Sequence, residues 1–330
     1  MTRWPLTCFL VVPLLVGCTP ADDTDVAVVD PCADAASCVD EARYTELITA
    51  LAVPRYPGSP GWSAAQDLCA TTFADAGFEV ERYDYGTGVN VIGRKPGADA
   101  SAEIVLLSAH YDSVADCTGA DDNASGVAGV LVAAEALASS SGPRELQVAC
   151  WDEEEDGLIG SLRYADRLAD EGRVVALSEV FEMIGYRSSE PDSQSMPNGF
   201  DLVFPDAVAA IEANAWRGDF ILLAADERAS EAVAAFAARG VVDGLPDIAL
   251  SLTAAQSISP LYSTLQRSDH ASFWYHGWPA VMINDTAEYR NGAYHCSEEE
   301  DSLDRLDLGF ATRVVRGAVA AAQGAATTDR

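Results

Sequence analysis

A histidine and several acidic residues stand close together early in the chain, with a spacing that suits metal binding. His110 and Asp112 are two positions apart, and a loop with Asp121 and Asp122 follows them. Side chains two positions apart on a strand point the same way, so the imidazole could bind a cation while the carboxylate fixes the ring. A structural interpretation competes: Asp122 or Asn123 could cap a helix, and His110 could be a hydrogen-bonded core residue. The loop by itself leaves both interpretations open.

Two more acidic groups occur in comparable places. The five acidic residues 152–156 follow the apolar run 145–151, and Glu182 lies near the end of another apolar run. An acidic run is ordinarily a solvated surface, and a charge on an edge strand is common. Adjacent carboxylates nevertheless repel one another unless a cation or a proton lies among them. Their positions relative to the strands therefore decide what they can do.

The apolar segments predict strands that would bring these groups to one edge of a sheet. Residues 103–109 place four apolar residues together just before a polar loop, which is typical of a buried strand. Further strands are predicted at 78–85, 89–95, 145–151, 174–186, 219–225 and 279–284, and helices at 41–52, 63–77, 126–137, 230–240, 268–276 and 306–323. Ligands bind at the carboxyl ends of strands in open α/β sheets. We therefore expect His110, the acidic run and Glu182 to share one edge.

The composition favours a folded α/β protein and excludes some partners. The chain has 330 residues, 49% of them hydrophobic, which is enough for one large core. Its net charge of −32 and its single lysine, Lys95, argue against nucleic acid as a partner, because such a surface repels phosphates. Gly86-Thr-Gly88 lacks the third glycine of a dinucleotide site, and the Gly-x-Ser-x-Gly elbow of serine hydrolases does not occur.

The first residues resemble an export signal. Arg3 precedes the short apolar run 4–16, and Leu15-Val-Gly-Cys18 resembles a bacterial lipobox, in which the cysteine is acylated. We expect residues 1–17 to be a lipoprotein signal peptide, 18–40 an acidic tether and 41–330 a single folded domain. The protein would then be an exported lipoprotein of the outer membrane or cell surface, held to the membrane only through the lipid on Cys18. An ordinary signal peptide with a periplasmic or secreted product is the alternative.

Six motifs in order give the chain a family resemblance. They are His110-x-Asp112, Gly119-Ala-Asp-Asp-Asn-Ala-Ser-Gly126, Glu154-Glu-x-Gly-Leu-x-Gly-Ser161, Glu182-Met-Ile-Gly-Tyr186, Ser268-Asp-His270 and Tyr294-His295. The chain thereby resembles, over about residues 100–310, the secreted bacterial co-catalytic zinc aminopeptidases, whose clan includes glutamate carboxypeptidases and glutaminyl cyclases. The resemblance implies a three-layer αβα fold with a central, mostly parallel mixed sheet, the phosphorylase/hydrolase-like zinc exopeptidase fold.

The same resemblance implies a set of metal ligands. Asp122 would bridge two zinc ions. His110 and Glu182 would complete one metal site, and Glu155 and His295 would complete the other. The family often has aspartate where this chain has Glu182, and the longer carboxylate can still reach a metal.

Two further residues take part in the chemistry by this resemblance: Glu154 as general base and Asp112 as the carboxylate that orients His110. On chemical grounds Tyr294 could donate a hydrogen bond to the oxyanion, with simple packing as the alternative. Glu153 would be the base if the motif were aligned one residue earlier, but the Glu-x-Gly-Leu spacing favours Glu154. The chemistry is consistent with such a set, because two zinc ions need a bridging group and acidify water at neutral pH. A positioned carboxylate can then carry a proton to the leaving amine.

The remaining candidates are weighed against structural roles. His270 is expected to be structural or to support a ligand, and His276 to lie on the surface or in the core. Arg290 could bind a substrate carboxylate, although a structural ion pair is favoured. Three aromatic residues could line a pocket for an apolar side chain, or simply pack in the core or at the rim: Phe273, Trp274 and Tyr289.

The six cysteines that follow the lipobox permit disulfides in an exported protein. We favour Cys117 with Cys296, since both flank proposed metal ligands, and Cys32 with Cys38 as a second pair. Cys150 lies in a core strand pattern and is expected to be a buried thiol. A Cys-x-x-Cys motif is absent from the sequence, so a thiolate zinc site is not expected.

Together these features predict a monomeric, exported di-zinc aminopeptidase that acts on peptides and binds no nucleic acid. A carboxypeptidase of the same clan is the nearest alternative, and Arg290 bound to a free C-terminus would favour it. A single-zinc glutaminyl cyclase is disfavoured because His110 and Glu182 preserve a second metal site. A non-catalytic ectodomain would be expected to lack a ligand or Glu154, and none is missing.

Overall fold

The computed structural model describes residues 1–2, 32, 34–99 and 103–328. Residues 3–17 of the predicted signal peptide and the lipobox Cys18 lie outside the described residues. Within the described part, no helix combines the length and the apolar character needed to cross a bilayer.

An eight-stranded sheet forms the centre of the domain, with its strands in the order β1-β2-β4-β3-β5-β8-β6-β7. The strands are β1 (Glu79–Asp84), β2 (Val89–Lys95), β3 (Ile104–His110), β4 (Glu145–Trp151), β5 (Val175–Glu182), β6 (Ile221–Asp226), β7 (Asp247–Leu252) and β8 (Ala280–Asn284). The four central strands β4, β3, β5 and β8 are parallel, while β2 is antiparallel to β4 and β6 is antiparallel to β8. The expected mostly parallel mixed sheet is confirmed.

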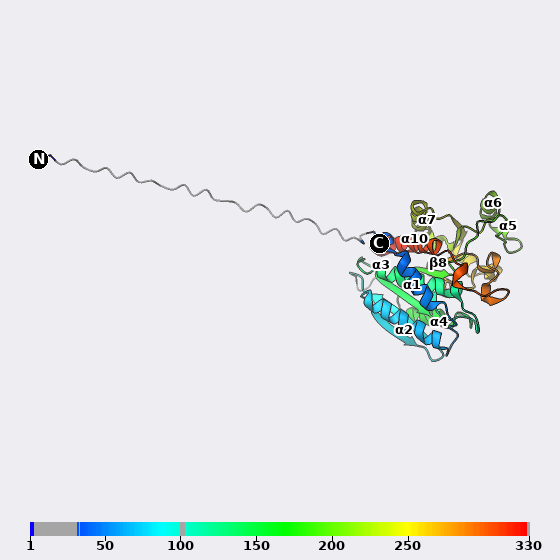
Figure 1. The fold of residues 1–330 in the computed structure, drawn as a ribbon, viewed down its shortest axis with the longest axis horizontal. Helices are drawn as coiled ribbons and strands as arrows, with labels where there is room; N and C mark the ends of the chain where they lie inside the picture. Colours follow the sequence, from blue (N-terminus) through cyan, green and yellow to red (C-terminus); the bar gives the residue numbers. More distant parts are fainter. Residues whose placement is uncertain (3–31, 33, 100–102, 329–330) are drawn as a thin grey trace. The chain divides into compact units, whose positions relative to one another are not determined.

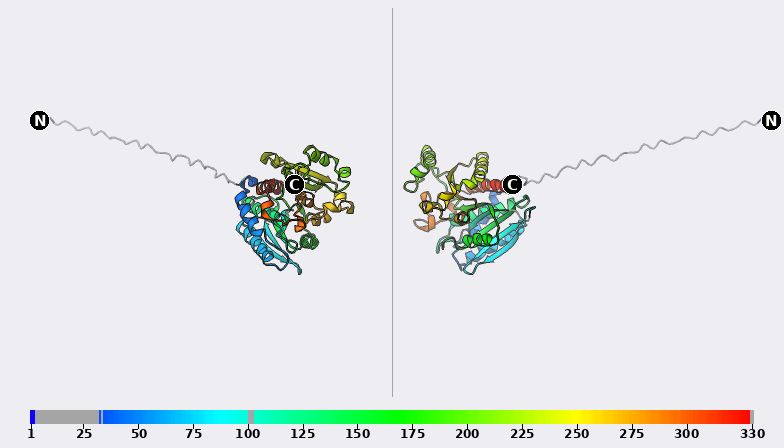
Figure 2. Two further views of the ribbon diagram at one scale, coloured as in Figure 1. Left: turned by 45° about the vertical axis from the view of Figure 1, so that its right-hand side comes forward. Right: turned by 180° about the vertical axis from the view of Figure 1, so that it is seen from behind.

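Helices cover both faces of this sheet and make the three layers. One face carries α1 (Glu41–Leu51), α2 (Pro60–Asp75), α3 (Gly126–Ala136), α7 (Ser230–Asp243) and α10 (Leu308–Thr327). The other face carries α4 (Ile159–Asp170), α6 (Pro205–Ala213) and α9 (His270–Tyr275). Figure 1 shows α10 beside α3 and α7, and Figure 2 shows the sheet and its covering helices from two further sides.

Burial on both faces explains the continuous apolar pattern of β3. All seven of its residues are buried. Leu107 contributes to the core on one face, and Leu106 contributes to the core on the other. A strand covered on both sides does not alternate polar and apolar residues, so β3 is continuously apolar from Ile104 to Leu107. The same burial fixes His110 at the strand's carboxyl end.

The folded domain begins before residue 41, contrary to the predicted tether boundary. Residues 35–38 form a short 3₁₀ helix, and Ala35 and Ala36 are fully buried. The Ala35 N–H donates to Gln323 of α10 over 3.2 Å, and Arg316 of α10 donates to the Val39 carbonyl over 3.1 Å. Small apolar side chains pack here in spite of the acidic residues around them.

Three disulfides join the described cysteines, and one of them corrects a prediction. The pairs Cys117–Cys296 and Cys32–Cys38 form as expected. Cys150 is not a free thiol, because it is bonded to Cys69 of α2. Cys150 faces the side of the sheet on which α2 packs, so the helix brings Cys69 against it.

The region between β5 and β8 holds the main elements that the sequence pattern did not reveal. The short helices α5 (Phe200–Val203) and α6 precede β6, and the edge strand β7 follows α7. β7 is only partly buried, so its apolar alternation is weak. The predicted strand 174–186 also ends earlier, at Glu182.

Candidate metal centre

Four of the five predicted metal ligands lie at or just after the carboxyl ends of central strands. His110 is the last residue of β3 and Glu182 is the last residue of β5. Glu155 follows β4, and Asp122 lies in the turn Ala120–Ser125 that leads from β3 into α3. His295 is different, because it comes from a short 3₁₀ helix, Tyr294–Cys296, in the loop after β8.

The structure brings these five side chains together around Asp122. The Asp122 Oδ1 atom lies 3.4 Å from Nε2 of His110, and its Oδ2 atom lies 3.3 Å from Nε2 of His295. Glu182 Oε2 is 3.4 Å from His110 Nε2, and Glu155 Oε2 is 3.2 Å from His295 Nε2. Each histidine therefore faces one oxygen of Asp122 and one oxygen of a glutamate.

A metal ion fits the chemistry of these groups. The Nε2 atom of His110 is buried and has no hydrogen-bond partner among the described residues, although three carboxylate oxygens surround it. Within each of two groups, the possible metal-binding atoms all lie within 4.8 Å of one another. The groups are His110 with Glu154 and Glu182, and His110 with Asp122 and Glu155. Imidazole nitrogens and carboxylate oxygens are ordinary zinc ligands. A cation would also relieve the repulsion among the carboxylates.

Asp112 links His110 to the acidic loop after β4. Its Oδ1 atom lies 3.4 Å from Nδ1 of His110. The backbone N–H groups of Glu154 and Glu155 donate to its carboxylate over 3.2 Å each. The arrangement agrees with an orienting function, since a fixed Nδ1 leaves Nε2 to face the candidate ligands.

Glu154 rather than Glu153 faces the centre. The Oε2 atom of Glu154 lies 4.0 Å from Nε2 of His110. Glu153 is turned away, because its carboxylate accepts a hydrogen bond from Thr87 over 2.7 Å. The alternative alignment that makes Glu153 the base therefore has no geometric support.

The surroundings of His295, Glu154 and Glu155 favour their protonated forms in this cluster. Burial lowers the pKa of His295, but hydrogen bonds to Asp122 and Glu155 outweigh burial and raise it to about 10. Burial raises the pKa of Glu155 to about 7, and burial likewise raises the pKa of Glu154 well above its usual range. Burial raises the pKa of Asp122, but His110 and His295 outweigh burial and lower this pKa below its usual range. Metal binding would replace these protons.

Supporting residues that the sequence did not reveal surround the ligands. Asp301 accepts hydrogen bonds from the backbone N–H of Asp121 and Asp122 over 3.0 and 2.9 Å. Arg55 is fully buried and donates to backbone carbonyls, including that of Gly119 over 2.8 Å. The hydroxyl of Ser268 donates to Glu182 over 2.6 Å. Of these, only Ser268 lay in a recognisable motif.

Several other candidates have structural positions. His270 is fully buried, with Nε2 2.7 Å from the Leu265 carbonyl oxygen, and His276 pairs with Asp166 at the surface over 3.0 Å. Arg290 is buried and donates to Gln194 and to the Phe220 carbonyl. Phe273 and Trp274 lie in the core, whereas Tyr289 and Tyr294 line a pocket beside the metal centre.

This pocket has a charged end and an apolar end. Asp122, Glu154, Glu182 and His295 line the charged end. The apolar wall is formed mainly by Met196, Phe200, Phe220, Leu222, Leu265 and Met282. The pocket thus joins candidate ligands to a surface suited to an apolar side chain.

Sequence comparison assigns the family. The family model "Peptidase family M28" matches residues 90–219. The uncharacterized protein YfbL of Escherichia coli K12 is 32% identical over 239 residues, which cover 67% of this chain and 66% of that protein. This chain belongs to peptidase family M28. Aminopeptidase YwaD of Bacillus subtilis is 36% identical over 131 residues, or 38% of this M28 peptidase and 28% of YwaD. The chain therefore spans about two thirds of the first relative and much less of the second.

Solved structures agree with the predicted clan. The Legionella pneumophila LapA aminopeptidase has a TM-score of 0.69 at 18% identity, covering 90% of this chain and 75% of LapA. The zinc aminopeptidase BSAP of Bacillus subtilis has a TM-score of 0.53 at 21% identity, and the match covers 74% of this chain and 52% of BSAP. The Fimbriiglobus ruber glutaminyl cyclase has a TM-score of 0.57 at 17% identity, and the match covers 86% of this chain and 95% of the cyclase. These likenesses concern the fold of this M28 peptidase.

Proposed function

We propose that this M28 peptidase is a di-zinc aminopeptidase that removes N-terminal residues from peptides. The observation that carries the proposal is the position of Asp122, which presents one carboxylate oxygen to His110 and the other to His295. A carboxylate in this position suits a bridge between two cations roughly 3.5–4 Å apart. Aminopeptidases among the relatives and the solved structures support the same activity.

The five ligands divide into two sets. His110, Glu182 and one oxygen of Asp122 would hold the first ion, and His295, Glu155 and the other oxygen of Asp122 would hold the second. Zinc bound there would polarise the scissile carbonyl and acidify water for attack at neutral pH.

Glu154 is the proposed general base. It lies beside both sets, with Oε2 4.0 Å from His110 Nε2, and it lines the pocket. Its carboxylate would accept the proton of the attacking water and return it to the amine that leaves. Tyr294 lines the pocket and would donate a hydrogen bond from its hydroxyl to the oxyanion, since its oxygen accepts from Arg267 over 2.9 Å and keeps its own hydrogen as a donor.

The charges of the pocket favour a substrate with a free N-terminus. Glu154 and Glu182 line the pocket next to the apolar wall. Of these two, Glu154 is not an assigned metal ligand, so its carboxylate attracts an ammonium group at the end of the substrate and repels a terminal carboxylate. Arg267 lines the same pocket, but Glu288 and Tyr294 already accept its hydrogen bonds. The apolar wall would hold a first side chain such as leucine, methionine or phenylalanine.

The alternatives have less support. Arg290, the residue that would favour a carboxypeptidase, is buried behind Phe220 and Gln194. A single-zinc glutaminyl cyclase would not need both histidines opposite Asp122. A non-catalytic ectodomain would not need Glu154 in the pocket beside a full set of ligands.

Amino-acyl 4-nitroanilides and capped peptides test the proposal. Leucyl and phenylalanyl anilides should be hydrolysed, activity should vanish on chelation, and zinc should restore it. N-acetylation should abolish cleavage, while C-terminal amidation of a peptide should be tolerated. The opposite pattern for the two caps would identify a carboxypeptidase and refute the proposal.

We also propose that the protein is exported and anchored through a lipid on Cys18. Three disulfides support an oxidising compartment, since such bonds are rare in the cytosol. Metabolic labelling with a fatty-acid analogue should mark the wild-type protein but not C18S. Labelling of both proteins, or of neither, would contradict this anchor.

A further inference from the structure

His295 is the candidate ligand whose position depends least on the sheet. The other four side chains lie at strand ends or in the turn before α3, and they are 1–12% exposed, whereas the His295 side chain is 36% exposed. His295 and Cys296 both have positive φ angles, of 53° and 52°. Two consecutive non-glycine residues in this region persist only where neighbouring contacts hold them.

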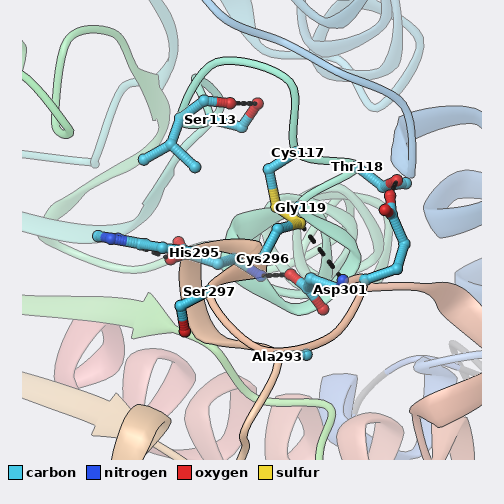
Figure 3. The surroundings of a disulfide bond; sticks show 12 residues. Ser113, Cys117, Thr118, Gly119, Ala293, His295, Cys296, Ser297 and Asp301 are labelled. Carbon is cyan, nitrogen blue, oxygen red and sulfur yellow. Dashed lines mark hydrogen bonds and ion pairs between the residues drawn. A yellow bond between two sulfur atoms is a disulfide. The ribbon is translucent and has the colours of Figure 1, made fainter.

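A disulfide supplies one such contact. Cys296, the residue after His295, is bonded to Cys117 (Figure 3). Cys117 is buried and lies in the loop between His110 and Asp122. The two residues after Cys117 are held in place by Arg55, which donates to the Thr118 carbonyl over 3.0 Å and to the Gly119 carbonyl over 2.8 Å. The bridge therefore joins the His295 loop to a fixed part of the domain.

Asp301 connects the same disulfide to Asp122. Its backbone N–H donates to Sγ of Cys296 over 3.4 Å (Figure 3). Its carboxylate accepts from the N–H of Asp122 over 2.9 Å. Both ligands that face each other across the second metal position are thus tied to one small unit. This unit, the clamp, consists of Cys117, Cys296 and Asp301.

The first metal position has different supports. Asp112 approaches Nδ1 of His110, and the Ser268 hydroxyl donates to Glu182. Apart from the shared Asp122, the ligands of this position are His110 and Glu182, and both end central strands. Their supports thus come from the sheet and from other loops rather than from the clamp. Opening the clamp should therefore affect the two positions unequally.

We propose that the clamp is a positioning device for the second metal ion, the one assigned to Asp122, Glu155 and His295. When it is opened, that ion is released while the ion at His110 and Glu182 stays bound. The inference rests on the proposed two-ion function. It adds that occupancy of the second metal position depends on whether the Cys117–Cys296 disulfide is intact. The active two-ion state would depend on the same disulfide.

Reduction would open the clamp by thiol–disulfide exchange. The two thiols of a dithiol reductant would lose two electrons and two protons and form a cyclic disulfide. Cys117 and Cys296 would gain them and become two thiols. The His295 loop would then be held only by its ends and by weaker contacts.

Metal content and affinity test the clamp. Wild-type protein, C117S/C296S and D301N are loaded with zinc, dialysed and measured by elemental analysis and by competition with a chromophoric chelator. We expect two ions in the wild type and one tightly bound ion in C117S/C296S, with the affinity for the other lowered about 10- to 100-fold. D301N keeps the disulfide and should weaken the same ion.

A matched variant, C69S/C150S, removes a disulfide remote from the clamp and should retain two ions. If C117S/C296S does not fold, D301N and dithiol-treated C32S/C38S protein give the same comparison, because the remaining Cys69–Cys150 pair is buried. Retention of both ions at unchanged affinity, or equal weakening of both, would overturn the inference. Fewer than two ions in the wild type would instead refute the two-ion function.

Discussion

The two ends of the pocket are built in different ways. The charged end comes from the ends of parallel strands and is supported by a continuous set of contacts, such as those of Asp112 and Asp301. The apolar end comes from the segment around Met196, from the start of β6 and from β8. Chemistry requires ligands fixed to within fractions of an ångström, whereas an apolar wall needs only shape and the absence of charge. The two ends should therefore respond differently to substitution.

The largest effect is expected at the charged end. E154Q keeps the size of the side chain but removes the proton acceptor, so kcat should fall by at least about 10²-fold while metal content stays unchanged. Steady-state kinetics and elemental analysis of the same preparation measure both. The adjacent E153Q is the control, because Glu153 is bound to Thr87 and faces away from the centre. A kcat of E154Q close to that of wild type would remove Glu154 from its proposed role.

A smaller effect is expected at the apolar end. M196D places a carboxylate in the apolar wall, so kcat/KM for a leucyl anilide should fall by about 10- to 100-fold, because the ionised side chain opposes burial of an apolar group. Metal content should not change, and M196L should remain within a few fold of wild type. Loss of zinc from M196D would show that the two ends are not independent.

The smallest effect is expected at Glu179, a buried carboxylate of β5 outside the candidate metal centre. Glu179 lies three residues before Glu182 on β5, but it points into the core, is 1% exposed and leaves one carboxylate oxygen without a hydrogen-bond partner among the described residues. Burial raises the pKa of Glu179 well above its usual range. The neutral form of Glu179 is therefore favoured in the folded protein. Above the unfolded pKa of about 4.3, the unfolded chain releases this proton while the folded protein keeps it, so the free energy of unfolding falls as pH rises.

The expected slope for this one group is a loss of about 1.4 kcal/mol of unfolding free energy per pH unit, up to its folded pKa. E179Q should remove that slope, and denaturant titrations from about pH 5 to about pH 8, above the unfolded pKa of glutamate, measure it. E212Q, at an exposed position on α6, is the control and should keep the slope of the wild type. Equal slopes in E179Q and wild type would show that Glu179 does not titrate in this way.

The sequence predicted which side chains meet at the charged end. His110 and Glu182 end predicted strands, and the family resemblance pointed to Asp122, Glu155 and His295. That these residues bind metal stays a prediction. The apolar end was not predicted. Phe273 and Trp274 were candidates for the pocket but pack in the core, and Met196 and Phe220 were not considered. Their segment has short helices and little periodicity, so no pattern indicated which side chains would face the ligands. Asp301 and Arg55 were missed because they act on backbone groups, which sequence motifs do not reveal.

The reversed direction of β6 has a consequence for how such a protein can change. Because β6 is antiparallel to β8, Leu222 pairs with Asn284, and Asn284 pairs with Glu182. The amino end of one strand thus borders the carboxyl ends of its neighbours. Mutations in the connection that enters β6 can therefore reshape the apolar wall of the pocket without altering any strand that carries a candidate ligand. Substrate preference could therefore diverge among descendants of this chain while the hydrolytic machinery stays intact.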